Sequence, residues 1–185
     1  PYRGGAPAIV DLAAGRVQAQ PVINELLINP PGTDDAPNEY IELRGTPNYV
    51  FPAGSYLIVL EGDTSSTPGT IDDIFELAGR TIGGNGFLVL LQKNHPYSPH
   101  PNASVYVNTG TDDGWGSGST SSIGHRGNTS LENGSKTFLL IQTTNPPALG
   151  MDLDANDDGR PDHPQYASWL VWDSVGVMDL HADIT

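Results

Sequence analysis

The chain alternates between short apolar runs and clusters of turn-forming residues. Each run is rich in Val, Ile, Leu, Phe or Tyr and is bounded by Gly, Pro, Asn, Asp or Ser, and no apolar repeat of 3.6 residues continues for the length of a helix. This pattern predicts an all-β protein. The expected strands lie within residues 22–29, 39–45, 55–62, 73–79, 86–92, 103–109, 137–143 and 168–177.

Three of these runs are apolar at consecutive positions: YLIVL at 56–60, FLVLL at 87–91 and FLLI at 138–141. A strand that is apolar on both faces is central in its sheet and covered on both sides. We therefore expect a β-sandwich in which loops or a neighbouring chain cover an outer face. Trp169 and Trp172 are three residues apart in the last run, so we expect them to enter the core from opposite faces.

Two segments do not fit the strand pattern. Residues 108–130 are rich in Gly, Ser and Thr, which predicts a long surface loop with Trp115 at its tip, where it could contact a carbohydrate ligand or a partner protein. The other is an extended arm, residues 1–20, in front of a single domain of residues 21–185. Free termini fray unless something holds them, so we expect the arm to pair with its own domain or with another copy.

Composition and charge narrow the classes of function. The 185 residues include 22 Asp and Glu, 8 Lys and Arg, and no Cys, with a formal net charge of -14. This charge would repel a phosphate backbone and argues against nucleic acid as a direct partner, and without Cys there is no disulfide or thiolate metal site. No apolar run approaches the roughly 18 residues that span a bilayer. A first residue that is not Met, with no basic-then-apolar leader, fits the mature form of a secreted protein, extracellular or at the cell surface.

An acidic stretch near the C-terminus, MDLDANDDGRPDHP at residues 151–164, has the spacing of a calcium loop. Aligned as D-x-N-x-D-G-x-x-D, it places oxygen ligands at alternate positions and a glycine at the sharp turn, as in the first half of an EF-hand-like loop. The twelfth position is Gln165, so the usual bidentate Glu is missing. We predict Ca²⁺ rather than Mg²⁺, which tolerates an all-protein cage poorly, and the alternative is a solvated acidic turn. The predicted ligands are Asp152, Asp154, Asn156, Asp158, Asp162 and the carbonyl of Arg160.

A second acidic group lies around the first two expected strands. Two of its members are on adjacent strands, and the others are in or beside the loop between them, so together they could hold a second calcium ion. Ordinary exposed carboxylates of strands and turns are an equally good interpretation. The group consists of Glu25, Asp34, Asp35, Glu39 and Glu42.

Three N-x-[ST] sequons begin at Asn102, Asn128 and Asn133, all between expected strands, where a glycan would be solvated. The sequence carries no catalytic signature that we can identify. None of the five His residues belongs to an H-E-x-x-H motif, and no Ser lies in a G-x-S-x-G elbow. We therefore predict that the protein is not an enzyme.

Several of these stretches together resemble the lamin-tail-like domains of bacterial secreted and surface proteins. The resemblance begins with PVINELLINPPGTDDAPNEYIEL, continues through SYLIVLEGD, GTIDDIFELAG, ENGSKTFLLI and LDANDDGRPD to WLVWDSVGVMD, and covers roughly residues 21–180. It implies an immunoglobulin-like β-sandwich that serves as an appended, non-catalytic module. Two departures are Arg44-Gly45 in place of the usual "YN" and a long insertion at 94–128.

The resulting expectation is a secreted, calcium-binding structural protein. It would be a subunit of a cell surface or of an extracellular filament, and it would self-associate into a homo-polymer by placing its N-terminal arm on the next copy. The alternative is an accessory module of a larger secreted enzyme, which binds carbohydrate or protein through Trp115 and the loops.

Overall fold

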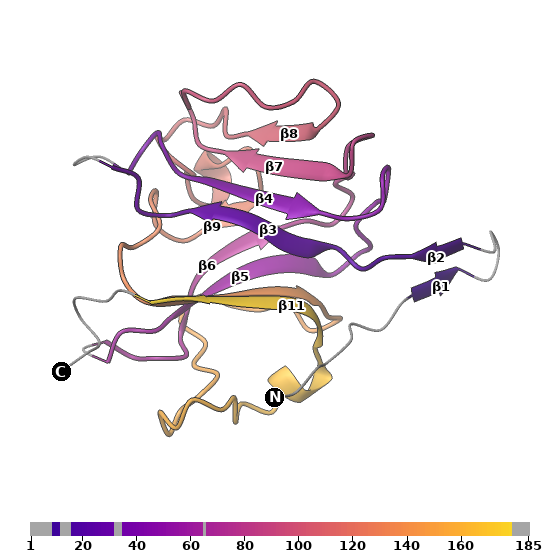
Figure 1. Cartoon of the computed structure of the whole chain (residues 1–185). Helices are drawn as coiled ribbons and strands as arrows, with labels where there is room; N and C mark the ends of the chain where they lie inside the picture. Colours follow the sequence, from indigo (N-terminus) through magenta and orange to yellow (C-terminus); the bar gives the residue numbers. More distant parts are fainter. Residues whose placement is uncertain (1–8, 12–15, 32–34, 65, 179–185) are drawn as a thin grey trace.

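The computed structural model describes residues 9–11, 16–31, 35–64 and 66–178 (Figure 1). These residues form an all-β structure without an α-helix, and its two short 3-10 helices are η1 (Gly118–Thr120) and η2 (Tyr166–Ser168). The strands are β1 (Ile9–Asp11), β2 (Arg16–Gln18), β3 (Val22–Leu27), β4 (Tyr40–Arg44), β5 (Ser55–Glu61), β6 (Ile71–Glu76), β7 (Phe87–Leu91), β8 (Ser104–Val107), β9 (His125–Arg126), β10 (Lys136–Gln142) and β11 (Leu170–Val177).

The strands form two packed sheets, which confirms the predicted β-sandwich. One sheet has the order β3-β4-β7-β8, and the other has the order β11-β10-β5-β6-β9. All pairs are antiparallel except β7 with β8, which run parallel. Each of the eight expected runs overlaps one strand, although β6 begins two residues and β10 one residue before the expected run. The two-residue β9, which pairs with β6, was not expected because it is too short to give a periodic signal.

The core lies between the sheets and is built from alternate residues of the strands. In β5, Leu57 and Val59 face the opposite sheet, whereas Ile58 and Leu60 face outward. Every residue of β5 is nevertheless buried. The continuous apolar run at 56–60 is therefore, as predicted, a central strand that is covered on both sides.

A long segment, residues 147–169, covers the outer face of the five-stranded sheet, and we call it the cap. In Figure 1 the cap runs below β11, on the side away from the other sheet. Leu153 and Trp169 are buried, and together with Met151 and Tyr166 they pack on the outward-facing residues of β5, β6 and β10. Trp172 lies in the core between the sheets, so the two tryptophans do enter different apolar layers, as expected.

The expectation that Trp115 is exposed at the tip of a surface loop is wrong. Its indole is fully buried, packs edge-to-face on Phe75 with 5.1 Å between ring centroids, and donates through Nε1 to the carboxylate of Glu39 at 2.6 Å. The buried His125 also holds this segment against the five-stranded sheet. One of its ring nitrogens lies 2.5 Å from the Gly116 carbonyl and the other 3.0 Å from Asp73 Oδ1. Composition predicted the loop, but it did not show that the loop folds back into the core.

The N-terminal hairpin of β1 and β2 projects beyond one end of the sandwich (Figure 1). It forms a separate two-stranded sheet that precedes β3 directly. The remaining residues of the predicted arm, 1–8 and 12–15, lie outside the described part of the chain. Within the described part, no helix is long and apolar enough to cross a bilayer.

Candidate functional site

The acidic loop is the outer part of the cap, and backbone pairing fixes its base. The N–H of Leu153 donates to the Gly69 carbonyl at 3.0 Å, and Ile71 exchanges two backbone hydrogen bonds with the cap. Gly69 has a φ of +85°, and a Cβ at this position would lie 2.8 Å from the Cβ of Asp154. Only glycine fits both conditions, so the approach of the acidic loop to the sheet depends on this residue.

Asp154, the first residue of the calcium-loop spacing, is the centre of the loop. It is buried, its Oδ2 accepts from the N–H of Gly159 at 2.7 Å, and its Oδ1 accepts from that of Asp158 at 3.3 Å. Gly159 has a φ of +78° and Asp157 a φ of +54°, which produce the sharp turn. The chain therefore curls around the carboxylate of Asp154.

The other predicted side-chain ligands also bond to backbone N–H groups of the loop. Asn156 Oδ1 accepts from Asp158 at 3.1 Å, and Asp158 Oδ1 accepts from Arg160 at 2.9 Å. Asp152 bonds in the same way to the N–H of residue 154 at 2.9 Å, and Asp162 to that of residue 155 at 3.2 Å. A carboxylate oxygen has two lone pairs, so one such hydrogen bond still leaves capacity for a cation.

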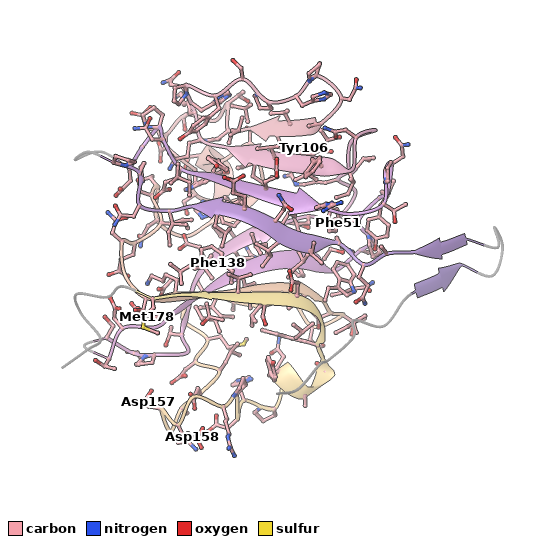
Figure 2. All side chains as sticks on the ribbon, in the orientation of Figure 1. Phe51, Tyr106, Phe138, Asp157, Asp158 and Met178 are labelled. Atoms are coloured by element: carbon pink, nitrogen blue, oxygen red, sulfur yellow. The ribbon has the colours of Figure 1, made fainter. Side chains whose placement is uncertain are left out.

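The loop carboxylates are not drawn together as tightly as a closed cation site requires. Among the described residues, the one group of three acidic side chains with oxygens within 4.8 Å of one another lies elsewhere. Gln165, at the twelfth position, turns its amide nitrogen to the carbonyls of Asn145 and Pro146, at 2.8 and 3.0 Å. Figure 2 shows Asp157 and Asp158 at the far end of the cap, away from the sheets.

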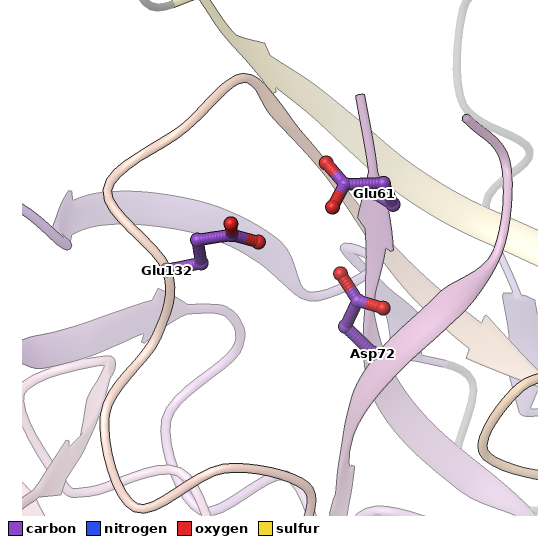
Figure 3. Close-up of side chains that lie close together, drawn as sticks. All are labelled: Glu61, Asp72 and Glu132. Atoms are coloured by element: carbon purple, nitrogen blue, oxygen red, sulfur yellow. The ribbon is translucent and has the colours of Figure 1, made fainter. Parts of the chain in front are cut away.

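The close acidic group consists of Glu61, Asp72 and Glu132, which are grouped tightly enough to hold a metal ion (Figure 3). The ammonium of Lys136 lies among them, with Nζ 2.6 Å from Glu132, 2.9 Å from Asp72 and 3.1 Å from Glu61. Burial lowers the pKa of Lys136, but the three hydrogen bonds outweigh burial and raise it above its usual value. The lysine therefore supplies the positive charge that a metal would bring.

The predicted second metal group is divided in the structure. Glu25 and Glu42 lie opposite each other on β3 and β4. Asp35 instead accepts from the side-chain amide of Asn133 at 3.1 Å, and Asp34 lies outside the described residues. Glu39 points into the core and is fully buried. The turn before β4 separates these carboxylates, because it sends Glu39 inward.

Glu39 is held by three donors that converge on one of its oxygens. Oε2 accepts from Trp115 Nε1 at 2.6 Å, Gln92 Nε2 at 2.7 Å and the N–H of Leu131 at 3.1 Å, whereas Oε1 has no partner. Burial raises the pKa of Glu39 to about 8, although the bonds from Leu131 and Trp115 oppose the shift. At neutral pH this residue is mainly a neutral acid that ties three segments together.

The three predicted sequon residues, Asn102, Asn128 and Asn133, are all exposed, so a glycan at any of them would meet solvent. Sequence analysis did not single out the Lys136 cluster or the buried pair of Asp73 and His125. A usable signal was available for the cluster, since Glu61 and Lys136 stand at the ends of buried apolar runs, where a charge requires a partner.

The fold and the site together define the class of the protein: an all-β sandwich of two packed sheets with an acidic loop on a cap over one of them. No family profile matches this chain, and no curated protein sequence and no solved structure matches it significantly.

Proposed function

We propose that the protein is a secreted, calcium-binding structural subunit. In this proposal the sandwich is a lamin-tail-like domain of immunoglobulin type, and it carries Ca²⁺ on the loop of residues 152–162. The ion would neutralise clustered aspartates and fix the cap on the sheet, a stabilisation that disulfides provide in other extracellular proteins.

The arrangement around Asp154 is the observation that carries the calcium proposal. Oxygens at the first, third and fifth positions all lie on one short turn, and the glycine at the sixth position adopts the required positive φ. Movement of Asp158 and Asp162 toward Asp154 would complete a set of hard oxygen ligands, which is the kind that Ca²⁺ prefers.

The projecting hairpin supports the proposal that copies associate. Each of its strands has only three residues, and a two-stranded sheet on its own is marginally stable in water. Contact with a second copy would stabilise it, and a head-to-tail contact of this type extends into a filament. The alternative of a carbohydrate-binding module loses its candidate platform because Trp115 is buried.

Calcium titration by calorimetry, with sedimentation velocity in calcium and after chelation, tests the function. Asp158→Asn keeps an oxygen that can accept from Arg160 but removes one ligand charge, so we expect it to weaken calcium binding by at least about tenfold. Asp157→Asn is the matched control, because Asp157 lies in the same turn but outside the ligand spacing, and Asn tolerates its positive φ. We expect this control to bind as the wild type does.

Large species that shrink after chelation would support a calcium-stabilised assembly. Absence of calcium binding in the wild type would refute the calcium site, and equal weakening by both variants would show an effect of general charge. A single small species in both conditions would refute self-association.

A further inference from the structure

The outer face of the four-stranded sheet carries a groove of about 250 Å³. Val89 and Leu91 form an apolar floor, and both are buried. Tyr40 and Tyr97 form an aromatic wall, with ring centroids 5.0 Å apart in an edge-to-face arrangement. The other sheet has its outer face covered by the cap, whereas this face presents an accessible recess.

Two carboxylates line the groove, and no cation among the described residues lies beside them. Glu25 and Glu42 are directly opposite across β3 and β4, a placement in which like charges destabilise a sheet. Their described partners are neutral: Tyr40 Oη donates to Glu25 at 2.5 Å, and Asn24 Nδ2 donates to Glu42 at 2.6 Å. Arg44, on the same face, lies over the Phe87 ring instead.

Burial and the neighbouring Glu25 raise the pKa of Tyr40 to about 12, so the phenol stays neutral near neutral pH. Two charged oxygen groups beside aromatic rings and an apolar floor suit an arginine. Its guanidinium can bond to carboxylates while its stem and planar face pack on the rings.

We propose that this groove receives the N-terminal arm of a second copy, with an arginine of that arm between Glu25 and Glu42. The inference rests on the proposed self-association and specifies which surface accepts the arm. Charge favours this occupant. The arm, residues 1–20, contains Arg3 and Arg16 against Asp11, a formal charge of +1, while the rest of the chain carries -15, so that together they give the total of -14.

The contact is heterologous, because the arm and the groove are different surfaces of one chain. The hairpin projects from the end of the sandwich, and the groove lies on a sheet face, so each copy can give an arm to one neighbour and receive an arm from another. Such a contact forms a filament if the rotation between copies does not close, and a ring if it does.

The test separates the arm from the groove by mixing two variants of the full chain. Glu25→Lys with Glu42→Lys disables the groove, and Arg3→Gln with Arg16→Gln disables the arm. We expect each double variant alone to sediment as a monomer. A mixture of the two should form a dimer, because the intact arm of the first fits the intact groove of the second.

A milder pair, Glu25→Gln with Glu42→Gln, keeps acceptors for Tyr40 and Asn24 and should weaken self-association at least about tenfold. The matched control removes two exposed charges elsewhere, Glu76→Gln with Asp112→Asn, and should leave association unchanged. Circular dichroism checks that each variant is folded.

Different outcomes separate this inference from the proposed function. If deletion of residues 1–20 abolishes assembly but the groove variants assemble normally, the arm binds elsewhere and the groove proposal is overturned. If neither change affects assembly, the self-association proposal fails as well. A lower calcium stoichiometry in the Gln pair would assign the groove to Ca²⁺ and also overturn the proposal.

Discussion

Glu39 is a residue whose protonation is strongly altered by the fold. Its carboxyl is completely buried, one oxygen accepts three hydrogen bonds, and the other has none. A proton on the free oxygen neutralises the group without breaking any of the three bonds. Burial therefore raises its pKa to about 8, from 4.5 in an exposed site.

This shift predicts a fall in stability as the pH rises. A carboxyl with a raised pKa in the folded state contributes its full stability below the pKa of the unfolded chain, and this contribution is lost as the pH rises toward and through 8. We expect the free energy of unfolding to decrease by up to about 1.4 kcal/mol per pH unit between pH 5 and 8 from this one proton. Urea unfolding at fixed ionic strength with calcium chelated measures the slope.

Glu39→Gln is the variant that identifies the source of this slope. Gln keeps one oxygen to accept the three hydrogen bonds and cannot ionise, so its stability should change less with pH and exceed that of the wild type above pH 8. Glu25→Gln, at an exposed carboxylate, should retain the wild-type slope. Parallel curves for the wild type and Glu39→Gln would show that this residue does not titrate in the range.

The cap is the element that connects the candidate metal loop to the core. Its apolar residues pack on the outward face of the five-stranded sheet, and its backbone pairs with residues 69–71. The charged side chains lie toward the tip of the loop, whereas the apolar side chains that pack on the sheet lie at its base. Any ion bound at the tip is therefore coupled to the stability of this apolar layer.

Gly69→Ala is predicted to loosen the cap. The new methyl group would meet the Cβ of Asp154 at 2.8 Å, and alanine is strained at a φ of +85°. We expect a loss of about 1–3 kcal/mol in the free energy of unfolding, together with weaker calcium binding. Gly79→Ala is the control, because Gly79 has a φ of +78° but no atom within 4 Å of the added Cβ.

The control separates strain from contact. If Gly79→Ala costs as much stability as Gly69→Ala, backbone strain explains the loss, and the contact with Asp154 contributes nothing. A larger loss for Gly69→Ala, with calcium affinity reduced only in that variant, would support the coupling of the cap to the loop.

The strands could be predicted from the sequence because apolar runs and turn residues report burial along a single segment. All eight expected runs overlap a strand, and the strands that were missed are short: β9 has two residues, and β1 and β2 in the predicted arm have three each. The fate of Trp115 and Glu39 could not be predicted in this way. Their burial depends on contacts between segments far apart in sequence, among them the Trp115–Glu39 hydrogen bond across 76 residues, and composition carries no information on such pairing.

The Lys136 cluster was missed for a related reason. Glu132 is only four residues before the lysine, but Glu61 and Asp72 come from other segments, and the register of β5, β6 and β10 brings them to it. The predicted calcium loop, by contrast, is contiguous in the sequence. Its turn geometry could therefore be predicted, whereas the distance between its carboxylates could not.

Across the whole molecule, 22 acidic residues against 8 basic ones produce strong self-repulsion at neutral pH. Added salt screens this repulsion over a Debye length of about 10 Å at 0.1 M ionic strength. Calcium bound at one site would act differently. It would stabilise the folded state to an extent set by the ratio of the free calcium concentration to the dissociation constant of that site. The two effects can be distinguished. Screening depends on the total ionic strength and on all charged residues, whereas specific binding depends on the calcium concentration and on the residues of the acidic loop.

We predict that millimolar calcium raises the midpoint of thermal unfolding more than NaCl or MgCl₂ at matched ionic strength. A free calcium concentration 100 times the dissociation constant adds about 2.7 kcal/mol, or about 5–10 °C for a chain of this size. Asp158→Asn should lose most of this increment and keep the response to NaCl, whereas Asp157→Asn should keep both. Equal midpoints in all three salts would mean that the acidic loop is a solvated turn and that calcium acts only by screening.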